Sequence, residues 1–184
     1  MGITLAPVPL SLVWNLQGDP ARADFMGDVE RRFGRSPPTL ANTTSRSADS
    51  TLLWIGPKSW LWVAHPSAPP RLTPADFERT RDALNQQGGA LFDVSAGRVA
   101  FSLSGVQAAT VLAKGCPLDL HPRAFAVGHC AQSVLGRVNA LIYKRDEASF
   151  VVMVARSFAA DIWHSLYLSS EPGGCEVRAP AAFA

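Results

Sequence analysis

The segments Leu-Leu-Trp-Ile-Gly-Pro-Lys-Ser-Trp-Leu-Trp-Val (residues 52–63) and Ala-Leu-Ile-Tyr-Lys-Arg-Asp-Glu-Ala-Ser-Phe-Val-Val-Met-Val (residues 140–154) decide the fold. Each consists of two apolar runs on either side of a short polar turn, which is the pattern of an antiparallel β-hairpin. A segment with helical spacing follows each hairpin, the first opening at Thr73 and the second at Phe158. This repeated unit of a hairpin and a helix predicts two similar halves.

The segments around the hairpins extend the repeat. In the first half, a strand, a helix and a final strand are expected at residues 10–17, 20–34 and 90–95. In the second half, a strand, a helix and one additional strand precede the hairpin, at residues 98–103, 105–115 and 129–135. The order of elements predicts an α+β fold with duplicated ferredoxin-like βαββαβ halves, whose antiparallel sheets carry their helices on one face.

These halves are expected at about 10–95 and 96–169, within a single domain that covers residues 1–184. Residues 35–50 are polar and predict a long loop, which is either a surface loop or an arm that becomes ordered against a partner. Residues 171–184 are rich in Gly, Pro and Ala, and we expect them to form a flexible tail.

The composition favours a chain that binds other proteins. Hydrophobic residues make up 47% of the 184 residues, and charged residues make up 17%, below the ~25% of ordinary soluble domains. Apolar surface left over from the core usually marks a partner interface. The net charge is +2 without a basic stripe, which argues against nucleic-acid binding.

The sequence also bears on localisation. No targeting segment or membrane-length apolar run is visible. Three cysteines are too few, and odd in number, for a disulfide scaffold, so we expect a cytoplasmic protein.

Residues suited to metal binding or catalysis are present, but in unsuitable patterns. Cys116, His121, His129 and Cys130 fit no common zinc spacing. His129 and Cys130 are adjacent on a predicted strand and therefore point to opposite faces. Cys116 has His121 as a possible activating base, but a small buried thiol is the favoured interpretation. Asp93 is the one acid within an apolar strand, where accepting backbone N–H bonds is the common role.

The region from residue 92 to residue 125 resembles a known family. The sequence reads Phe-Asp-Val-Ser-Ala-Gly-Arg at 92–98, Leu-Ser-Gly at 103–105 and Leu-Ala-Lys-Gly-Cys-Pro-Leu-Asp-Leu-His-Pro-Arg-Ala-Phe at 112–125. With weaker matches over about residues 50–168, it is similar to the gamma subunit of heterotetrameric sarcosine oxidase. The motif residues are Asp93, Ser95, Gly97, Arg98, Gly105, Gly115, Cys116, Pro117, Leu118, Asp119, His121 and Pro122.

That family is in turn similar to the folate-binding domain of glycine-cleavage aminomethyltransferases, which implies the same duplicated fold. Those enzymes carry an acidic loop where this chain has Gly-Arg-Val-Asn at 136–139. The resemblance therefore implies a non-catalytic structural subunit that binds no cofactor itself. It also implies larger alpha- and beta-type subunits and a small delta-type subunit as partners.

The complex implied by the resemblance demethylates sarcosine oxidatively to glycine. It transfers the one-carbon unit to tetrahydrofolate and forms hydrogen peroxide, and its flavin, NAD and tetrahydrofolate belong to the partner subunits. Large aromatic and arginine side chains commonly anchor interfaces. The candidates are Trp54, Trp60, Trp62 and Arg123; the alternative for the tryptophans is the core of the chain itself.

Two other functions remain open. The first is a stand-alone folate-binding or one-carbon transfer protein, which needs an acid such as Asp93 or Asp119 facing a pocket between the halves. The second is a subunit of a related oxidase that acts on another N-methyl amine. Thermal protection of the isolated chain by tetrahydrofolate distinguishes the first alternative from the subunit assignment.

Overall fold

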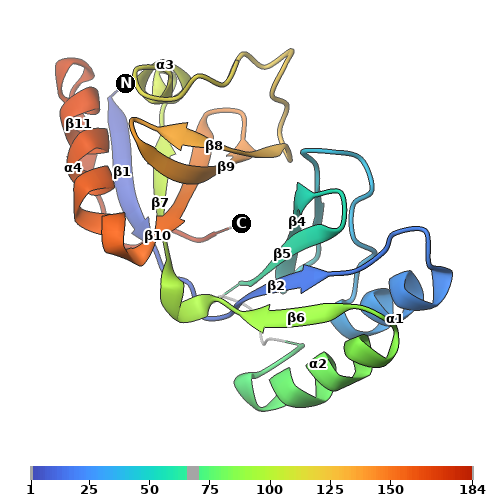
Figure 1. Cartoon of the computed structure of the whole chain (residues 1–184). Helices are drawn as coiled ribbons and strands as arrows, with labels where there is room; N and C mark the ends of the chain where they lie inside the picture. Colours follow the sequence, from blue (N-terminus) through green and yellow to red (C-terminus); the bar gives the residue numbers. More distant parts are fainter. Residues whose placement is uncertain (1, 66–70, 184) are drawn as a thin grey trace. The chain divides into compact units, whose positions relative to one another are not determined.

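Two sheets organise the chain, and each belongs to its own unit of the computed structural model, which describes residues 2–65 and 71–183 (Figure 1). We call residues 10–96 unit B, and we call residues 97–183 together with the N-terminal residues up to Pro9 unit A. The short helix η2 (Ser95–Gly97) lies where the chain passes from one unit to the other.

Unit B consists of a five-stranded sheet with helices packed on one face. Its strands are β2 (Val13–Gln17), β3 (Thr44–Arg46), β4 (Ser50–Gly56), β5 (Ser59–Ala64) and β6 (Ala90–Asp93). Its helices are α1 (Ala23–Phe33), the short η1 (Pro74–Asp76) and α2 (Phe77–Gln86). The strand order is β3-β4-β5-β2-β6, and all neighbours are antiparallel. With α1 and α2 as connections, β2, β4, β5 and β6 form a ferredoxin-like βαββαβ arrangement.

Local sequence explains the helices and the hairpin of unit B. In α1, Phe25, Val29 and Phe33 form one buried stripe. The helix ends at Gly34, whose φ of 76° is the left-handed conformation that glycine accepts readily. Strands β4 and β5 form the predicted hairpin around Gly56. The core between the sheet and the helices is rich in aromatic side chains. The ring centroids of Trp14 and Trp62 are 5.0 Å apart.

Unit A consists of a six-stranded sheet in the order β11-β1-β7-β10-β9-β8. Its strands are β1 (Ile3–Val8), β7 (Arg98–Ser104), β8 (Cys130–Leu135), β9 (Val138–Asp146), β10 (Ser149–Ala155) and β11 (Cys175–Val177). Its helices are α3 (Ala108–Ala113), α4 (Ala159–Ser170) and the short η3 (Arg156–Phe158) and η4 (Glu171–Gly173). Only β1 and β11 pair in parallel among the described strands. The additional strand expected after the first helix of this half is β8.

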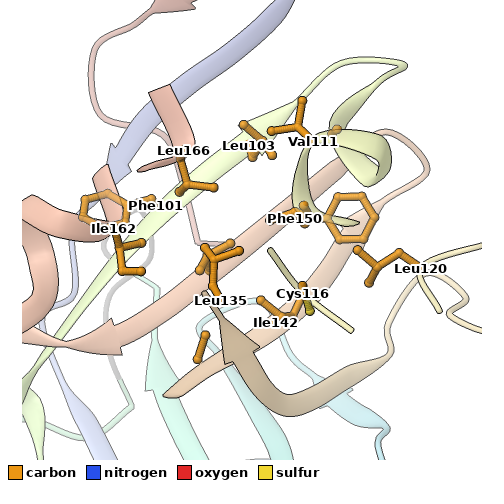
Figure 2. Close-up of a cluster of buried hydrophobic side chains, with 14 of the residues drawn as sticks. Phe101, Leu103, Val111, Cys116, Leu120, Leu135, Ile142, Phe150, Ile162 and Leu166 are labelled. Carbon is orange, nitrogen blue, oxygen red and sulfur yellow. The ribbon is translucent and has the colours of Figure 1, made fainter. Parts of the chain in front are cut away.

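The core of unit A lies between one face of this sheet and helices α3 and α4. Figure 2 shows side chains from the strands, from both helices and from the loop after α3 pointing into a single cluster. Its labelled members are Phe101, Leu103, Val111, Cys116, Leu120, Leu135, Ile142, Phe150, Ile162 and Leu166. The predicted α+β class with mainly antiparallel sheets is confirmed.

Strand β1 lies in a segment for which no strand was predicted, and its apolar run contains Pro7. It pairs with β7 along its length but with β11 only from Ile3 to Leu5. Pro7 therefore lies where the strand has a neighbouring strand on one side only, and proline's missing donor is tolerated there. Pro9 lies just beyond the strand.

The prediction of a flexible tail at 171–184 is wrong for its described part. Strand β11 pairs with β1, and the Phe183 ring stacks on Tyr143 at 5.7 Å between centroids. The Arg145 Nη1 group also donates to the Ala182 carbonyl at 2.6 Å. These partners are distant in sequence, so the local Gly, Pro and Ala composition did not reveal them.

The predicted loop at 35–50 contains a short strand, β3, which pairs with β4. Its residues Thr44, Ser45 and Arg46 are polar because β3 is an edge strand of the sheet. None of the helices in residues 2–65 and 71–183 combines the length and the apolar character that crossing a membrane requires.

Candidate functional site

The motif residues at 93–98 form a turn that anchors the sheet of unit B. Asp93 Oδ1 accepts hydrogen bonds from the Ser95 N–H at 2.9 Å and the Ser95 hydroxyl at 2.5 Å. The Ser95 Oγ atom also accepts from the Val13 N–H at 2.8 Å, which attaches the turn to the start of β2. The side chain of Asp93 is exposed, and its recorded bonds are those of a turn acid rather than a catalytic acid.

Three motif residues of unit A shape the backbone around strand β7. Gly97 is exposed, with open space where a Cβ atom would lie. Arg98 begins β7 and its carbonyl accepts from Arg156 Nη2 at 3.3 Å. Gly105 ends this segment with a φ of 125°, and a Cβ atom there would lie 2.8 Å from the Gly2 carbonyl oxygen. Glycine is therefore required at 105 by both conformation and space.

The loop from Gly115 to Phe125, which we call the motif loop, is anchored to the core at several points. The Gly115 carbonyl accepts from the Gly136 N–H at 2.8 Å, which joins the loop to the β8–β9 turn. Cys116 is buried, and its thiol lies 3.7 Å from the Ser133 hydroxyl. Leu120 belongs to the same cluster (Figure 2). Leu118 packs against this cluster, whereas Pro117 is exposed.

The polar residues of the motif loop form its second turn and leave their side chains at the surface. Asp119 Oδ1 accepts from the His121 N–H at 2.9 Å. His121 Nδ1 accepts from the Arg123 N–H at 3.2 Å, and its carbonyl accepts from Phe125 at 2.8 Å. Over the described residues, no hydrogen bond joins the Cys116 thiol to the His121 ring, so this arrangement does not pair the thiol with His121 as a base.

Lys144 is a buried charged residue that the motif search missed. It is 1% exposed and belongs to β9. Its Nζ atom donates to the Phe125 carbonyl at 3.0 Å and lies 5.9 Å from the centroid of the Phe150 ring. The sequence did contain a signal, because Lys144 has the same strand parity as the core residues Ala140 and Ile142.

Two cavities in unit A involve motif residues. One, of about 470 Å³, lies along β8 and β9 and is lined in part by Arg98, Gln132 and Asn139. The other, of about 300 Å³, lies between the motif loop and the β9–β10 hairpin and is lined in part by Pro122 and Lys144. Asp93 and Asp119 line neither cavity. The described residues contain no group of three or more side chains arranged to hold a metal ion.

The proposed interface tryptophans require a correction. Trp60 and Trp62 are buried beneath α1 and α2 in the core of unit B, so their side chains cannot reach a partner surface. Both faces of this hairpin are apolar in sequence, so the pattern did not reveal which face the helices cover. Trp54 is half-buried and packs against the same core, whereas Arg123 is exposed on the motif loop.

Comparison with known proteins places this geometry in a family. Residues 17–171 match the model of the "Sarcosine oxidase, gamma subunit family". The gamma subunit of sarcosine oxidase from Corynebacterium sp. (strain U-96) is 32% identical over 130 residues, which cover 71% of this chain and 60% of that protein. That from Corynebacterium sp. (strain P-1) is 33% identical over 137 residues, covering 72% and 63%. The match thus spans a little under two thirds of each relative.

Solved structures agree with the sequence relatives. A chain of heterotetrameric sarcosine oxidase from Corynebacterium sp. U-96, solved in complex with pyrrole 2-carboxylate, superposes with a TM-score of 0.82 at 28% identity, covering 96% of this chain and 88% of that chain. Aminomethyltransferase T of the glycine cleavage system from Bartonella henselae superposes with a TM-score of 0.59 at 14% identity, covering 97% and 48%, and shares the fold alone. By sequence and by structure, the chain belongs to the sarcosine oxidase gamma subunit family.

Proposed function

We propose that this chain is the non-catalytic gamma-type subunit of a heterotetrameric sarcosine oxidase. The observation that carries the proposal is the match of 96% of the chain to a chain of such an oxidase, with a TM-score of 0.82. The partners in this proposal are larger alpha- and beta-type subunits and a small delta-type subunit. The complete assembly oxidises sarcosine to glycine, passes the one-carbon unit to tetrahydrofolate and forms hydrogen peroxide.

The contacts of the motif residues support a structural rather than a catalytic role. Asp93 and Ser95 hold the start of β2, and Asp119 and His121 close the motif loop. These polar groups bind backbone atoms of their own chain instead of converging on a cavity. The turn between β8 and β9 carries Gly136 and Arg137, and no carboxylate. As the resemblance to the family implies, we assign the flavin, NAD and tetrahydrofolate to the partner subunits.

Exposed apolar side chains are the candidate contacts with the larger subunits. In unit A, Val106 is 77% exposed and Leu168 is 49% exposed, and Phe158 is exposed beside α4. In unit B, Phe92 is 49% exposed on β6. A stable interface needs roughly 1,600 Å² of buried area, and these side chains together with Arg123 supply anchors for it. We also propose that the complex is cytoplasmic, because the three cysteines suit a reducing compartment.

Deletion of this chain in its native host tests the structural role. We expect the larger subunits to accumulate less and to lose sarcosine oxidation together with assembly, and re-expression of the chain should restore both. A complex of unchanged mass and activity without the chain contradicts the proposal. The double variant Val106→Asp, Leu168→Asp, expressed in the same deletion host, tests the proposed contacts. If this variant folds normally and restores sarcosine oxidation, the proposed contacts are wrong.

The fold shared with an aminomethyltransferase makes folate binding by the isolated chain the second candidate function. A ligand at about 100 times its dissociation constant adds about 2.7 kcal/mol to the free energy of unfolding. Thermal unfolding with and without tetrahydrofolate measures this effect. We expect no protection, and a concentration-dependent rise in the melting temperature would favour a stand-alone one-carbon protein. A different N-methyl amine as substrate would be detected by assaying the purified assembly with several such amines.

A further inference from the structure

Lys144 places a positive charge inside unit A without an ion-pair partner among the described residues. Its side chain is on the core face of β9, 1% exposed, and donates one recorded hydrogen bond, to the Phe125 carbonyl. An ammonium group has three donors. Over residues 2–65 and 71–183, no carboxylate lies within 4.0 Å of its Nζ atom, since no ion pair is formed there. Burial of an uncompensated charge is costly, so this position favours an anion nearby.

Lys144 lines a cavity of about 300 Å³. Its walls come from the start of α3, from the motif loop and from the β9–β10 hairpin. Apolar side chains dominate them: Val106, Ala109, Leu120, Pro122 and Phe150. A volume of this size is at the lower end of the range for small-molecule sites, in which apolar walls and few polar groups are usual.

We propose that this cavity binds a small organic acid, with its carboxylate against Lys144 and its apolar body against Leu120 and Phe150. The charge-assisted hydrogen bond to the ammonium group fixes the orientation of the ligand, and the apolar walls select against small inorganic anions. This site lies within unit A and is independent of the packing role proposed for the subunit. It also gives a role to Pro122 of the motif loop, which lines the cavity.

Glu147 offers a competing explanation for the buried charge, and the test must separate the two. This residue is exposed at the hairpin tip and lines the same cavity, but it forms no ion pair with Lys144. If Glu147 served as the counter-charge of Lys144, Glu147→Gln would destabilise the chain and leave ligand affinity unchanged. If the cavity accepts an external carboxylate, Glu147→Gln removes a repelling charge and strengthens binding.

The experiment is calorimetric titration of the full chain with benzoate and with benzamide, its neutral counterpart of nearly the same shape. We expect benzoate to bind saturably and more tightly than benzamide. Lys144→Met should weaken benzoate binding about tenfold or more, the effect of losing a charged hydrogen bond, and leave benzamide binding within about twofold. Lys58→Met is the matched control, since Lys58 is an exposed lysine of unit B.

Two arms keep the proposal falsifiable if Lys144→Met does not fold. The comparison of benzoate with benzamide on the unaltered chain requires no variant. Ala109→Phe fills the cavity from α3 and keeps Lys144 in place, so it should abolish benzoate binding while the circular dichroism spectrum stays unchanged. Benzoate that fails to saturate, that binds no more tightly than benzamide, or that is unaffected by Ala109→Phe overturns the proposal.

Discussion

At the scale of the residue, the family motif consists mainly of groups that complete the backbone. Asp93 satisfies the Ser95 N–H and Ser95 satisfies the Val13 N–H at the start of β2, while Asp119 satisfies the His121 N–H. Unsatisfied buried or turn donors cost free energy comparable to a lost hydrogen bond. These motif residues are therefore explained by the hydrogen bonds of two turns, without a catalytic function.

The two motif glycines on either side of β7 differ in what they require. We expect Gly105→Ala to lower the free energy of unfolding by about 1–3 kcal/mol, because an L-residue at a φ of 125° is strained and its Cβ atom would meet the Gly2 carbonyl. Gly97→Ala is the matched control, since a Cβ atom there meets nothing within 4 Å, and it should stay within about 0.5 kcal/mol. Urea denaturation measures both; equal effects would contradict this assignment.

His65 makes the stability of the chain depend on pH. Burial lowers the pKa of His65 from its ordinary value of 6.5. The Ala48 carbonyl, 3.2 Å from Nδ1, can only accept, so Nδ1 carries the proton of the neutral ring, and Nε2 accepts from the Thr51 hydroxyl at 2.8 Å. The unfolded chain takes up a proton near pH 6.5, before the folded chain does. The contribution of the neutral His65 ring to the free energy of unfolding is therefore fully present above this pH. It decreases as the pH is lowered toward the pKa of the folded state.

We expect the urea concentration at the midpoint of unfolding to decrease when the pH is lowered from about 7.5 to about 5.5, the range in which histidine ordinarily titrates. The fall should be smaller in His65→Gln, which removes the buried titrating ring. His164→Gln, at an exposed position of α4, is the control and should behave like the unaltered chain. A fall of equal size in His65→Gln would show that other groups are responsible.

Sequence patterns predicted the roles of some residues better than others. The turn role of Asp93 and the buried thiol of Cys116 followed from neighbours within a few positions. The burial of Trp60 and Trp62 depends on which face of the sheet α1 and α2 cover, and both faces of that hairpin are apolar in sequence. Lys144 was overlooked because a charge at the end of a strand ordinarily reaches solvent.

At the scale of the element, the hairpins and the helices after them could be predicted, because their patterns are local. Strands β1 and β11 could not, because each is stabilised by pairing with residues far away in sequence. Leu5 shows the consequence: it lies in the first ten residues of the chain and is completely buried in the core of unit A. The N-terminal strand thus belongs to the unit formed by the second half of the sequence.

This placement of β1 predicts where a substitution acts. Leu5→Ala should lower the free energy of unfolding by about 2–5 kcal/mol, as for other buried leucines. In hydrogen exchange, protection should fall first in its partner strands β7 and β11, and residues 10–64 of unit B should be least affected. Thr4→Ala, a partly exposed neighbour on the same strand, is the control with a smaller effect. Losses confined to unit B would contradict the assignment of β1.

At the scale of the whole molecule, each unit carries its own core, and both sheets bear helices on one face. The strand order β4-β5-β2-β6 of unit B recurs in unit A as β9-β10-β7-β1, with the N-terminal strand in the last position. Because the two halves are only weakly similar in sequence, the duplication of one half to give the other stays a prediction.

The most direct test of the subunit assignment is gentle purification of the tagged chain from its native host, with the visible absorbance spectrum of the eluate recorded beside its polypeptide composition. The account predicts flavin absorbance and co-elution of two or more larger polypeptides, in a particle that oxidises sarcosine. A colourless eluate that contains only this chain, folded and stable, would contradict the central claim and would make the folate-binding protein the leading hypothesis.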